Sequence, residues 1–287
     1  MNKYSILEWN INQATNYSGN NDIPDFVFEE IRDKNADFVT LVEFAHSCKN
    51  TDDFLTKIKE IGYQVEYTDN KKNAKQNDVL IAWKGDKFHL EDPKDIYSPY
   101  PKGNIPEMLA IRLVANESNI PVVIVGARIK LCGNGEVAWN KRREQLSEML
   151  KNINNFHLEK NTIIVGDFNN NRIDLDKCNG KTFINLWSVK VIDKMIKDYG
   201  FIRCTPDNMA SIKQRNSIFR DDHLIINNKI KVISKKYCRE FANKNNNIYI
   251  HGQDFEVYNE YLHRTTWSIQ YGSGIPDHAI LQCEFEL

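Results

Sequence analysis

A short β-branched run that ends in polar residues most constrains how this chain can fold. Residues 162–165, Thr-Ile-Ile-Val, are β-branched throughout, which is typical of a strand buried on both faces. Gly166 then lets the backbone turn, and Asp167 and Asn169 follow where the strand ends. Polar side chains just past a buried strand are poorly placed for packing and well placed for chemistry. A Gly-Asp turn that simply closes a strand is the alternative interpretation, and this segment alone does not decide between the two.

Other predicted strands also end or begin in polar residues. These residues are Asn10 and Asn12, Glu43, Asp222, and Asp277 with His278. Asn is a poor strand residue, and a carboxylate at the tip of a buried strand must be exposed, paired or bound to metal. Each residue alone has a simpler interpretation as a turn or a solvated strand end. Their occurrence together along one chain favours a functional site.

The rest of the pattern alternates strands with helices. Apolar spacing predicts helices over residues 24–34, 52–61, 139–156 and 183–199. Further strands are predicted over residues 63–67, 79–83, 109–114, 122–130, 217–226 and 229–234. The chain shows no internal repeat and no Pro/Gly/Ser-rich linker, so a single domain over residues 1–287 is favoured.

Charge and cysteine content bound the class of protein. The chain has 287 residues, with 38 Lys plus Arg against 39 Asp plus Glu and a formal net charge of -1. This balance argues against a protein that coats nucleic acid non-specifically, but a local basic cleft remains compatible with it. The six cysteines form no Cys-x-x-Cys pair, which favours a reduced, cytoplasmic setting. We find no signal region and no bilayer-length apolar run, and we expect a monomer.

Taken in order, these motifs resemble those of the endonuclease/exonuclease/phosphatase superfamily, whose fold is that of deoxyribonuclease I. The most specific matches are Val165-Gly166-Asp167-Phe168-Asn169 and Pro276-Asp277-His278, with further matches at Trp9-Asn10-Ile11-Asn12, Leu41-Val42-Glu43 and Arg220-Asp221-Asp222-His223-Leu224. The resemblance covers nearly the whole chain. It implies an α/β (α+β) fold, a four-layer αββα sandwich of two mostly antiparallel sheets with helices outside.

The resemblance also implies a metal and a base. Glu43 and the amide oxygen of Asn10 would hold Mg²⁺ or Mn²⁺, because Mg²⁺ takes few protein ligands and prefers oxygen. Asp167 would position and deprotonate the attacking water. Asn169 would donate to the phosphate or hold Asp167 in place, and Asn12 is implied on the substrate side.

The C-terminal motif supplies the remaining implied roles. His278 would contact the scissile phosphate as an imidazolium donor, and Asp222 would hydrogen-bond His278 and favour its charged form. Asp277 would hold a second metal or the water shell beside the substrate. His223 is expected on the opposite face without a role in the site, because it directly follows the motif Asp.

Two features depart from the superfamily pattern. Arg128 stands where many members have His or Tyr; it cannot be a general acid at neutral pH, so we expect a phosphate clamp with two parallel donors. The aromatic-rich insertion around residues 235–274 replaces a short link. Its aromatic side chains are compatible with base stacking, but a small satellite core is the favoured interpretation for most of them.

The expected function is a metal-dependent hydrolase that acts on phosphate ester bonds. A nuclease that cleaves nucleic-acid phosphodiesters is the first interpretation. A phosphatase or phosphodiesterase for a small phosphorylated molecule or a lipid headgroup is the alternative, and a non-catalytic binding module is the lesser one. Basic residues could form a wall for a polyanion, although such a run is more often a solvated face: Lys229, Lys231, Lys235, Lys236 and Arg239.

Overall fold

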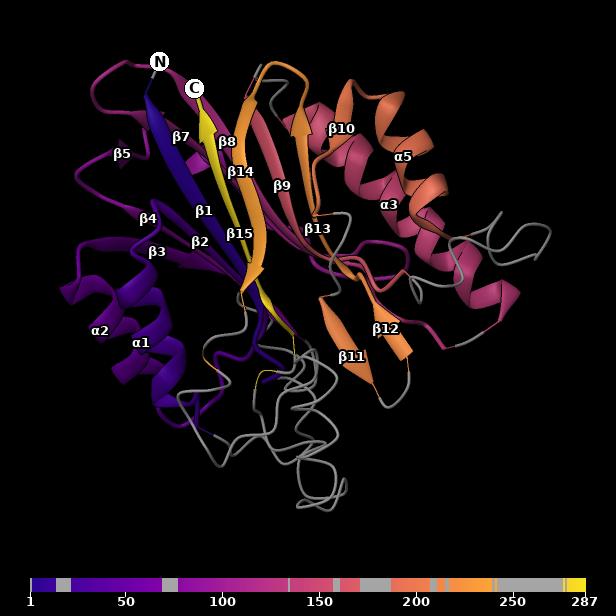
Figure 1. The fold of residues 1–287 in the computed structure, drawn as a ribbon, viewed down its shortest axis with the longest axis horizontal. Coiled ribbons are helices and arrows are strands. Elements are labelled where there is room, and N and C mark those ends of the chain that lie inside the picture. Colours follow the sequence, from indigo (N-terminus) through magenta and orange to yellow (C-terminus); the bar gives the residue numbers. More distant parts are fainter. Residues whose placement is uncertain are drawn as a thin grey trace.

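Two sheets lie face to face in the computed structural model, with helices on both outer sides (Figure 1). The structure describes residues 2–13, 22–68, 77–133, 135–156, 161–170, 187–206, 211–214, 217–238, 241, 276 and 278–287. The layers follow the order helix, sheet, sheet, helix. The four-layer αββα sandwich that the resemblance implies is therefore confirmed.

The first sheet has six strands in the order β14-β15-β1-β2-β4-β3. Their bounds are β1 (Lys3–Asn10), β2 (Phe38–Phe44), β3 (Tyr63–Tyr67), β4 (Asp78–Lys84), β14 (Lys231–Cys238) and β15 (Ile280–Glu286). Strands β1 and β2 are parallel, and the other neighbours are antiparallel. A parallel pair needs a crossover connection, and helix α1 (Asp25–Lys34) lies in it.

The second sheet has seven strands in the order β10-β13-β9-β8-β7-β5, with β6 also paired to β7. Their bounds are β5 (Phe88–His89), β6 (Ile96–Tyr97), β7 (Glu107–Ala115), β8 (Pro121–Arg128), β9 (Thr162–Asp167), β10 (Phe201–Arg203) and β13 (Asp222–Asn227). Its parallel pair is β8 with β9, and helix α3 (Glu136–Phe156) lies in the crossover. Both sheets are otherwise antiparallel, as expected.

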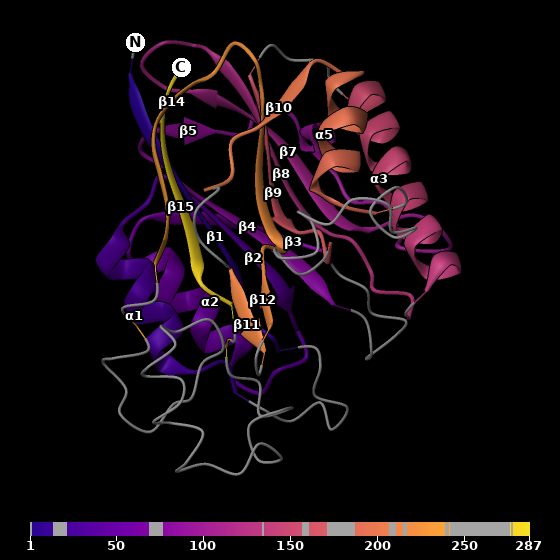
Figure 2. The ribbon, with the colours of Figure 1, turned by 45° about the vertical axis from the view of Figure 1, so that its right-hand side comes forward.

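The helices cover the outer faces in pairs, as Figure 2 shows. Helices α1 and α2 (Thr51–Glu60) pack on the first sheet, where Ile31 and Ile58 reach a shared apolar cluster. Helices α3 and α5 (Val189–Lys197) pack on the second sheet through Leu146 and Ile192. A short 3-10 helix, η1 (Pro93–Asp95), precedes β6. None of the helices in the described ranges combines the length and the hydropathy that a membrane span requires.

The layer between the sheets is the main core, and it leads directly to the strand tips. Alternate residues of a strand share one face, so Ile163 and Val165 of β9 enter this core and Asp167 continues on the same side. Likewise Ile124 of β8 leads to Arg128 on that face. Along these strands, the side that faces the other sheet therefore bears apolar residues in the core and polar residues at the tip. The polar tips lie at one end of the sandwich.

Two glycines allow the close approaches that this end requires. A Cβ on Gly166, whose φ is 149°, would lie 1.8 Å from the Ala127 carbonyl oxygen. A Cβ on Gly126 would lie 2.6 Å from Thr40 Cγ2 and from Val79 Cγ1 on the facing sheet. Gly166 therefore lets β9 lie against β8, and Gly126 lets the two sheets pack closely below the tips.

Several predicted strand boundaries are wrong. The strand predicted over 122–130 ends at Arg128, because Gln145 of α3 bonds the backbone nitrogen and oxygen of Lys130 at 2.9 and 3.1 Å. The strand predicted over 229–234 instead spans Lys231–Cys238, so it enters the range assigned to the insertion. That range is otherwise described only at Phe241, and the insertion stays a prediction.

The strand predicted over 217–226 is interrupted. A hairpin of β11 (Ile212–Gln214) and β12 (Ser217–Phe219) precedes β13. Where the chain passes from β12 to β13, the backbone nitrogens of Asp221 and Asp222 both donate to Ser211 Oγ, at 2.8 and 3.2 Å. This side chain takes the place of a strand partner at the break.

Candidate active site

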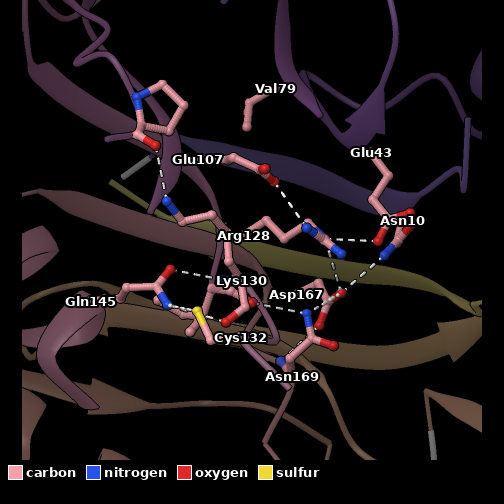
Figure 3. Close-up of polar contacts among 12 residues, drawn as sticks. Asn10, Glu43, Val79, Glu107, Arg128, Lys130, Cys132, Gln145, Asp167 and Asn169 are labelled. Atoms are coloured by element: carbon pink, nitrogen blue, oxygen red, sulfur yellow. Dashed lines mark hydrogen bonds and ion pairs between the residues drawn. The ribbon is translucent and has the colours of Figure 1, made fainter. Parts of the chain in front are cut away.

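The register of the second sheet sets four charged side chains in a row. Arg128 is paired with Glu107 on one side and with Asp167 on the other. Asp167 in turn is paired with Asp222 of β13. Asn10 and Glu43 approach this row from the first sheet, as Figure 3 shows. The structure therefore brings most of the sequence-predicted residues together at one end of the sandwich.

Asp167 is held by amides on both sides. Its Oδ2 accepts from Asn10 Nδ2 and from Asn169 Nδ2, each at 3.0 Å, and its Oδ1 accepts from the Asn169 backbone nitrogen at 2.8 Å. Burial raises the pKa of Asp167 to about 6. Among its neighbours, His278 acts to lower this pKa and Asp222 acts to raise it. The carboxyl group therefore has a fixed orientation and a pKa close to neutral pH, which suits a general base.

Three residues of the tips have left-handed backbone conformations. The φ angles are 52° at Asn12, 51° at Glu43 and 46° at Asn169. Asn tolerates this region, whereas Glu adopts it less often, so the surrounding structure must hold Glu43 in place. Such local strain clusters at functional sites, and here it falls on residues that the sequence singled out.

Asp222 and His278 form the second part of the site. Asp222 Oδ2 lies 2.7 Å from His278 Nδ1, and the Asp222 side chain is fully buried. Trp9 Nε1 donates to the His278 backbone oxygen at 3.0 Å, and the Tyr237 hydroxyl donates to the Asp222 backbone oxygen at 2.5 Å. Because Nδ1 faces the carboxylate, any contact of the ring with a substrate runs through Nε2.

Arg128 lies among carboxylates rather than at an open surface. Its Nε is 2.7 Å from Glu43 Oε1, its Nη1 is 3.0 Å from Glu107 Oε2, and its Nε is 3.8 Å from Asp167 Oδ2. The Glu43 contact is an ion pair without hydrogen-bond alignment, whereas the Glu107 contact is also a hydrogen bond. Burial lowers the pKa of Arg128, but Glu43 and Glu107 outweigh it and raise that pKa above its usual value.

Glu43 and Asn10 offer oxygen ligands of the type that Mg²⁺ prefers. Glu43 offers a carboxylate, and Asn10 offers an amide oxygen that already accepts from the Asn12 backbone nitrogen at 3.0 Å. Each acceptor has a further lone pair, and Mg²⁺ commonly uses one or two carboxylates together with water. Within the described ranges, no three His, Cys, Asp or Glu side chains converge as a fuller metal site. A sparse site at Glu43 and Asn10 is thus compatible with the geometry, with Arg128 as a neighbouring cation.

Some residues from the sequence analysis are not described, and others have partners elsewhere. Asp277 and Arg239 fall outside the described residues. Lys231 pairs with Glu286 at 3.0 Å, and Lys235 Nζ donates to the Thr205 backbone oxygen at 3.2 Å. These two lysines of the expected basic wall therefore have local partners on and beside β14.

His223 lies on the opposite face from Asp222, as expected. It is fully buried, with Nδ1 3.0 Å from Thr205 Oγ1 and Nε2 2.7 Å from Asn170 Oδ1. Burial lowers the pKa of His223 well below its usual value. This histidine is a satisfied core residue.

Sequence reasoning missed three charged residues at the site. Glu107 pairs with Arg128, and Arg142 holds the backbone around the tips. Glu8 is fully buried, and neither of its carboxyl oxygens has a hydrogen-bond partner among the described residues. Burial, then Asp222, raises the pKa of Glu8 well above its usual value. Its signal was present in the sequence, because Glu8 precedes Asn10 by two residues on the same strand face.

Many solved structures have a similar fold, although neither comparison of the sequence finds a match. No family model matches the chain, and no curated protein matches it. An endonuclease/exonuclease/phosphatase from Bacteroides vulgatus is similar at 12% identity and a TM-score of 0.63, with 100% of both chains covered.

Two further similar structures have described ligands. The 2′,3′-cyclic phosphatase ANGEL2 with adenosine-2′,3′-vanadate is similar at 13% identity and a TM-score of 0.62, over 99% of this chain and 95% of that one. D. rerio TDP2 with a single-strand DNA product is similar at 13% identity and a TM-score of 0.60, over 100% of both chains. The protein is thus an αββα sandwich. Its fold is that of the endonuclease/exonuclease/phosphatase superfamily, as the motifs indicated.

Proposed function

We propose that the protein is a divalent-metal-dependent hydrolase of phosphate esters. The observation that carries this proposal is the arrangement of Asp167, held by Asn10 and Asn169, in the same row of strand tips as the Asp222–His278 pair. A buried carboxyl group with a pKa of about 6 is a suitable base. A carboxylate-bound histidine is a suitable donor to a phosphoryl oxygen.

In this mechanism, Asp167 orients a water molecule and accepts its proton. The water oxygen attacks phosphorus in line with the leaving oxygen, the ester P–O bond breaks, and the departing oxygen takes up a proton from solvent, to which Asp167 later returns the one it accepted. His278 donates to the phosphoryl oxygens as their charge grows, and Asp222 holds the ring at Nδ1. Glu43 and Asn10 would hold the metal, which would neutralise phosphoryl charge as a Lewis acid when bound.

A nuclease is the favoured substrate class, and a small-ester phosphatase is the alternative. The TDP2 neighbour holds a single-strand DNA product, which supports a polynucleotide substrate. The ANGEL2 neighbour is a 2′,3′-cyclic phosphatase, which supports a smaller phosphoester. Both substrate classes require the same chemistry at Asp167 and His278.

A substrate panel tests this proposal. The purified chain is incubated with supercoiled plasmid, single-stranded DNA, RNA and a set of small phosphoesters, with Mg²⁺, Mn²⁺ or a chelator. We expect metal-dependent nicking or strand cleavage by the native chain and none by the Asp167→Asn variant. Turnover of small esters alone would favour the phosphatase. Binding without turnover of any substrate would contradict the hydrolase proposal and favour a binding module.

A further inference from the structure

Arg128 joins the two sheets through carboxylates on both. Glu107 is its register partner on β7, and Asp167 is its register partner on β9. Glu43 comes from the facing sheet and lies 2.7 Å from Nε. The Arg128 side chain is 11% exposed, so solvent screens these ion pairs only weakly. A buried cation therefore already neutralises the carboxylate that the proposed metal site needs.

The two contacts of the guanidinium differ in kind. Nη1 makes an aligned hydrogen bond of 3.0 Å to Glu107, and such charge-assisted bonds are the stronger ones. The Nε contact with Glu43 is close but not aligned as a hydrogen bond. Glu107 is thus the firmer anchor, and the Glu43 contact is the one that can be exchanged.

We propose that Arg128 and a divalent cation compete for Glu43, so that metal binding opens the Nε–Glu43 contact while Glu107 retains the guanidinium. This inference rests on the proposed function, because it concerns the metal of that same site. Two cations beside one buried carboxylate repel each other, and this repulsion favours weakening of the Arg128 contact as the metal binds. The guanidinium edge that leaves Glu43 then faces the site, where a phosphate can accept from it.

Calorimetric titration with Mn²⁺ or Mg²⁺ tests the competition without any measurement of activity. The Arg128→Gln variant should bind the metal roughly tenfold more tightly than the native chain, because the competitor is gone. Arg112→Gln is the matched control. Arg112 also bridges two carboxylates, Glu91 at 2.8 Å and Asp95 at 3.2 Å, but its position on β7 is of opposite parity to that of Glu107. Metal affinity should be unchanged in this control.

A charge-balanced variant separates competition from a general effect of charge. Arg128→Gln with Glu107→Gln removes one positive and one negative charge together, so the local net charge is preserved. Competition predicts that this double variant still binds metal more tightly than the native chain. A metal affinity equal to the native value would show that the effect in Arg128→Gln came only from the change in local net charge, and it would overturn the inference.

The double variant also guards against failure of the single variant to fold. It leaves only Glu43 and Asp167 without the charge of Arg128, whereas the single variant also leaves Glu107. A Mn²⁺-induced rise in Tm then gives a second readout, which should be larger in the double variant than in the native chain. Unchanged or weaker metal binding in both Arg128 variants, or no binding at all, would overturn the competition. Absence of hydrolysis by the native chain in the substrate panel would instead count against the proposed function. The failure of the competition and the failure of the proposed function are therefore distinguishable.

Discussion

At the scale of single residues, the site depends on groups whose neighbours are fixed. Asp167 receives three hydrogen bonds from Asn10 and Asn169, and burial raises its pKa to about 6. A raised pKa means that the carboxyl group is protonated below about pH 6 and ionised above it. The ionised form is the one that can accept a proton from water.

The pH dependence of turnover tests this role. We expect log kcat/KM to rise with pH up to about pH 6 and then to level off, because Asp167 must lose its proton first. The Asp167→Asn variant should lower kcat by about a hundredfold or more, as is typical of lost acid-base help. A rate profile that is flat from acidic to neutral pH in the native enzyme would contradict the assignment.

At the scale of elements, Arg142 of α3 connects the loops that carry the site. Its Nε donates to the Leu131 oxygen at 2.8 Å, its Nη2 to the Gly133 oxygen at 2.7 Å, and its Nη1 to the Asn169 oxygen at 2.8 Å. Trp187 Nε1 also donates to the Asn169 oxygen, at 3.1 Å. These bonds hold Asn169 in its left-handed conformation, from which its amide reaches Asp167.

Replacing Arg142 should therefore affect both stability and catalysis. We expect Arg142→Gln to lower the free energy of unfolding by about 1–3 kcal/mol, because three carbonyl oxygens in partly buried hydrogen bonds lose a charged donor. It should also lower kcat more than it changes KM, since Asp167 loses its support. Arg143→Gln is the control, because Arg143 is the exposed neighbour on the same helix. Equal urea midpoints and equal kcat values for the two variants would refute the connection.

The element scale also shows what the sequence could predict. The motif Val165–Asn169 and the C-terminal Asp277-His278 identified the tips, and the structure places Asp167, Asp222 and His278 together. Glu107 was missed because its role comes from the register of β7 with β8, which is a long-range property. The Gln145 side chain that ends β8 at Arg128 was missed for the same reason.

At the scale of the whole molecule, the site exists because two sheets approach closely at one end. Gly126 leaves room for Thr40 and Val79 of the facing sheet, which a Cβ would approach to 2.6 Å. The chain termini lie at the other end of the sandwich from the tips (Figure 1). The tips therefore depend on the spacing between the sheets.

Substitution of Gly126 tests this dependence on spacing. Gly126→Ala should lower the free energy of unfolding by about 1–3 kcal/mol, because the added methyl group overpacks the interface between the sheets. Gly85→Ala is the control, since its Cβ would meet only the flexible Gln64 side chain, at 3.2 Å or more. Urea denaturation of both variants gives the comparison, and equal stability would mean that the sheets adjust freely.

The central claim is that these strand tips hydrolyse phosphate esters with the help of a divalent metal. The most direct measurement is the initial rate of hydrolysis of bis(p-nitrophenyl) phosphate by the native chain, with Mn²⁺ and after chelation, beside Asp167→Asn and His278→Ala. We predict chelator-sensitive turnover by the native chain and a loss of about a hundredfold or more in each variant. Equal turnover by all three proteins, or turnover that chelation leaves unchanged, would contradict the claim.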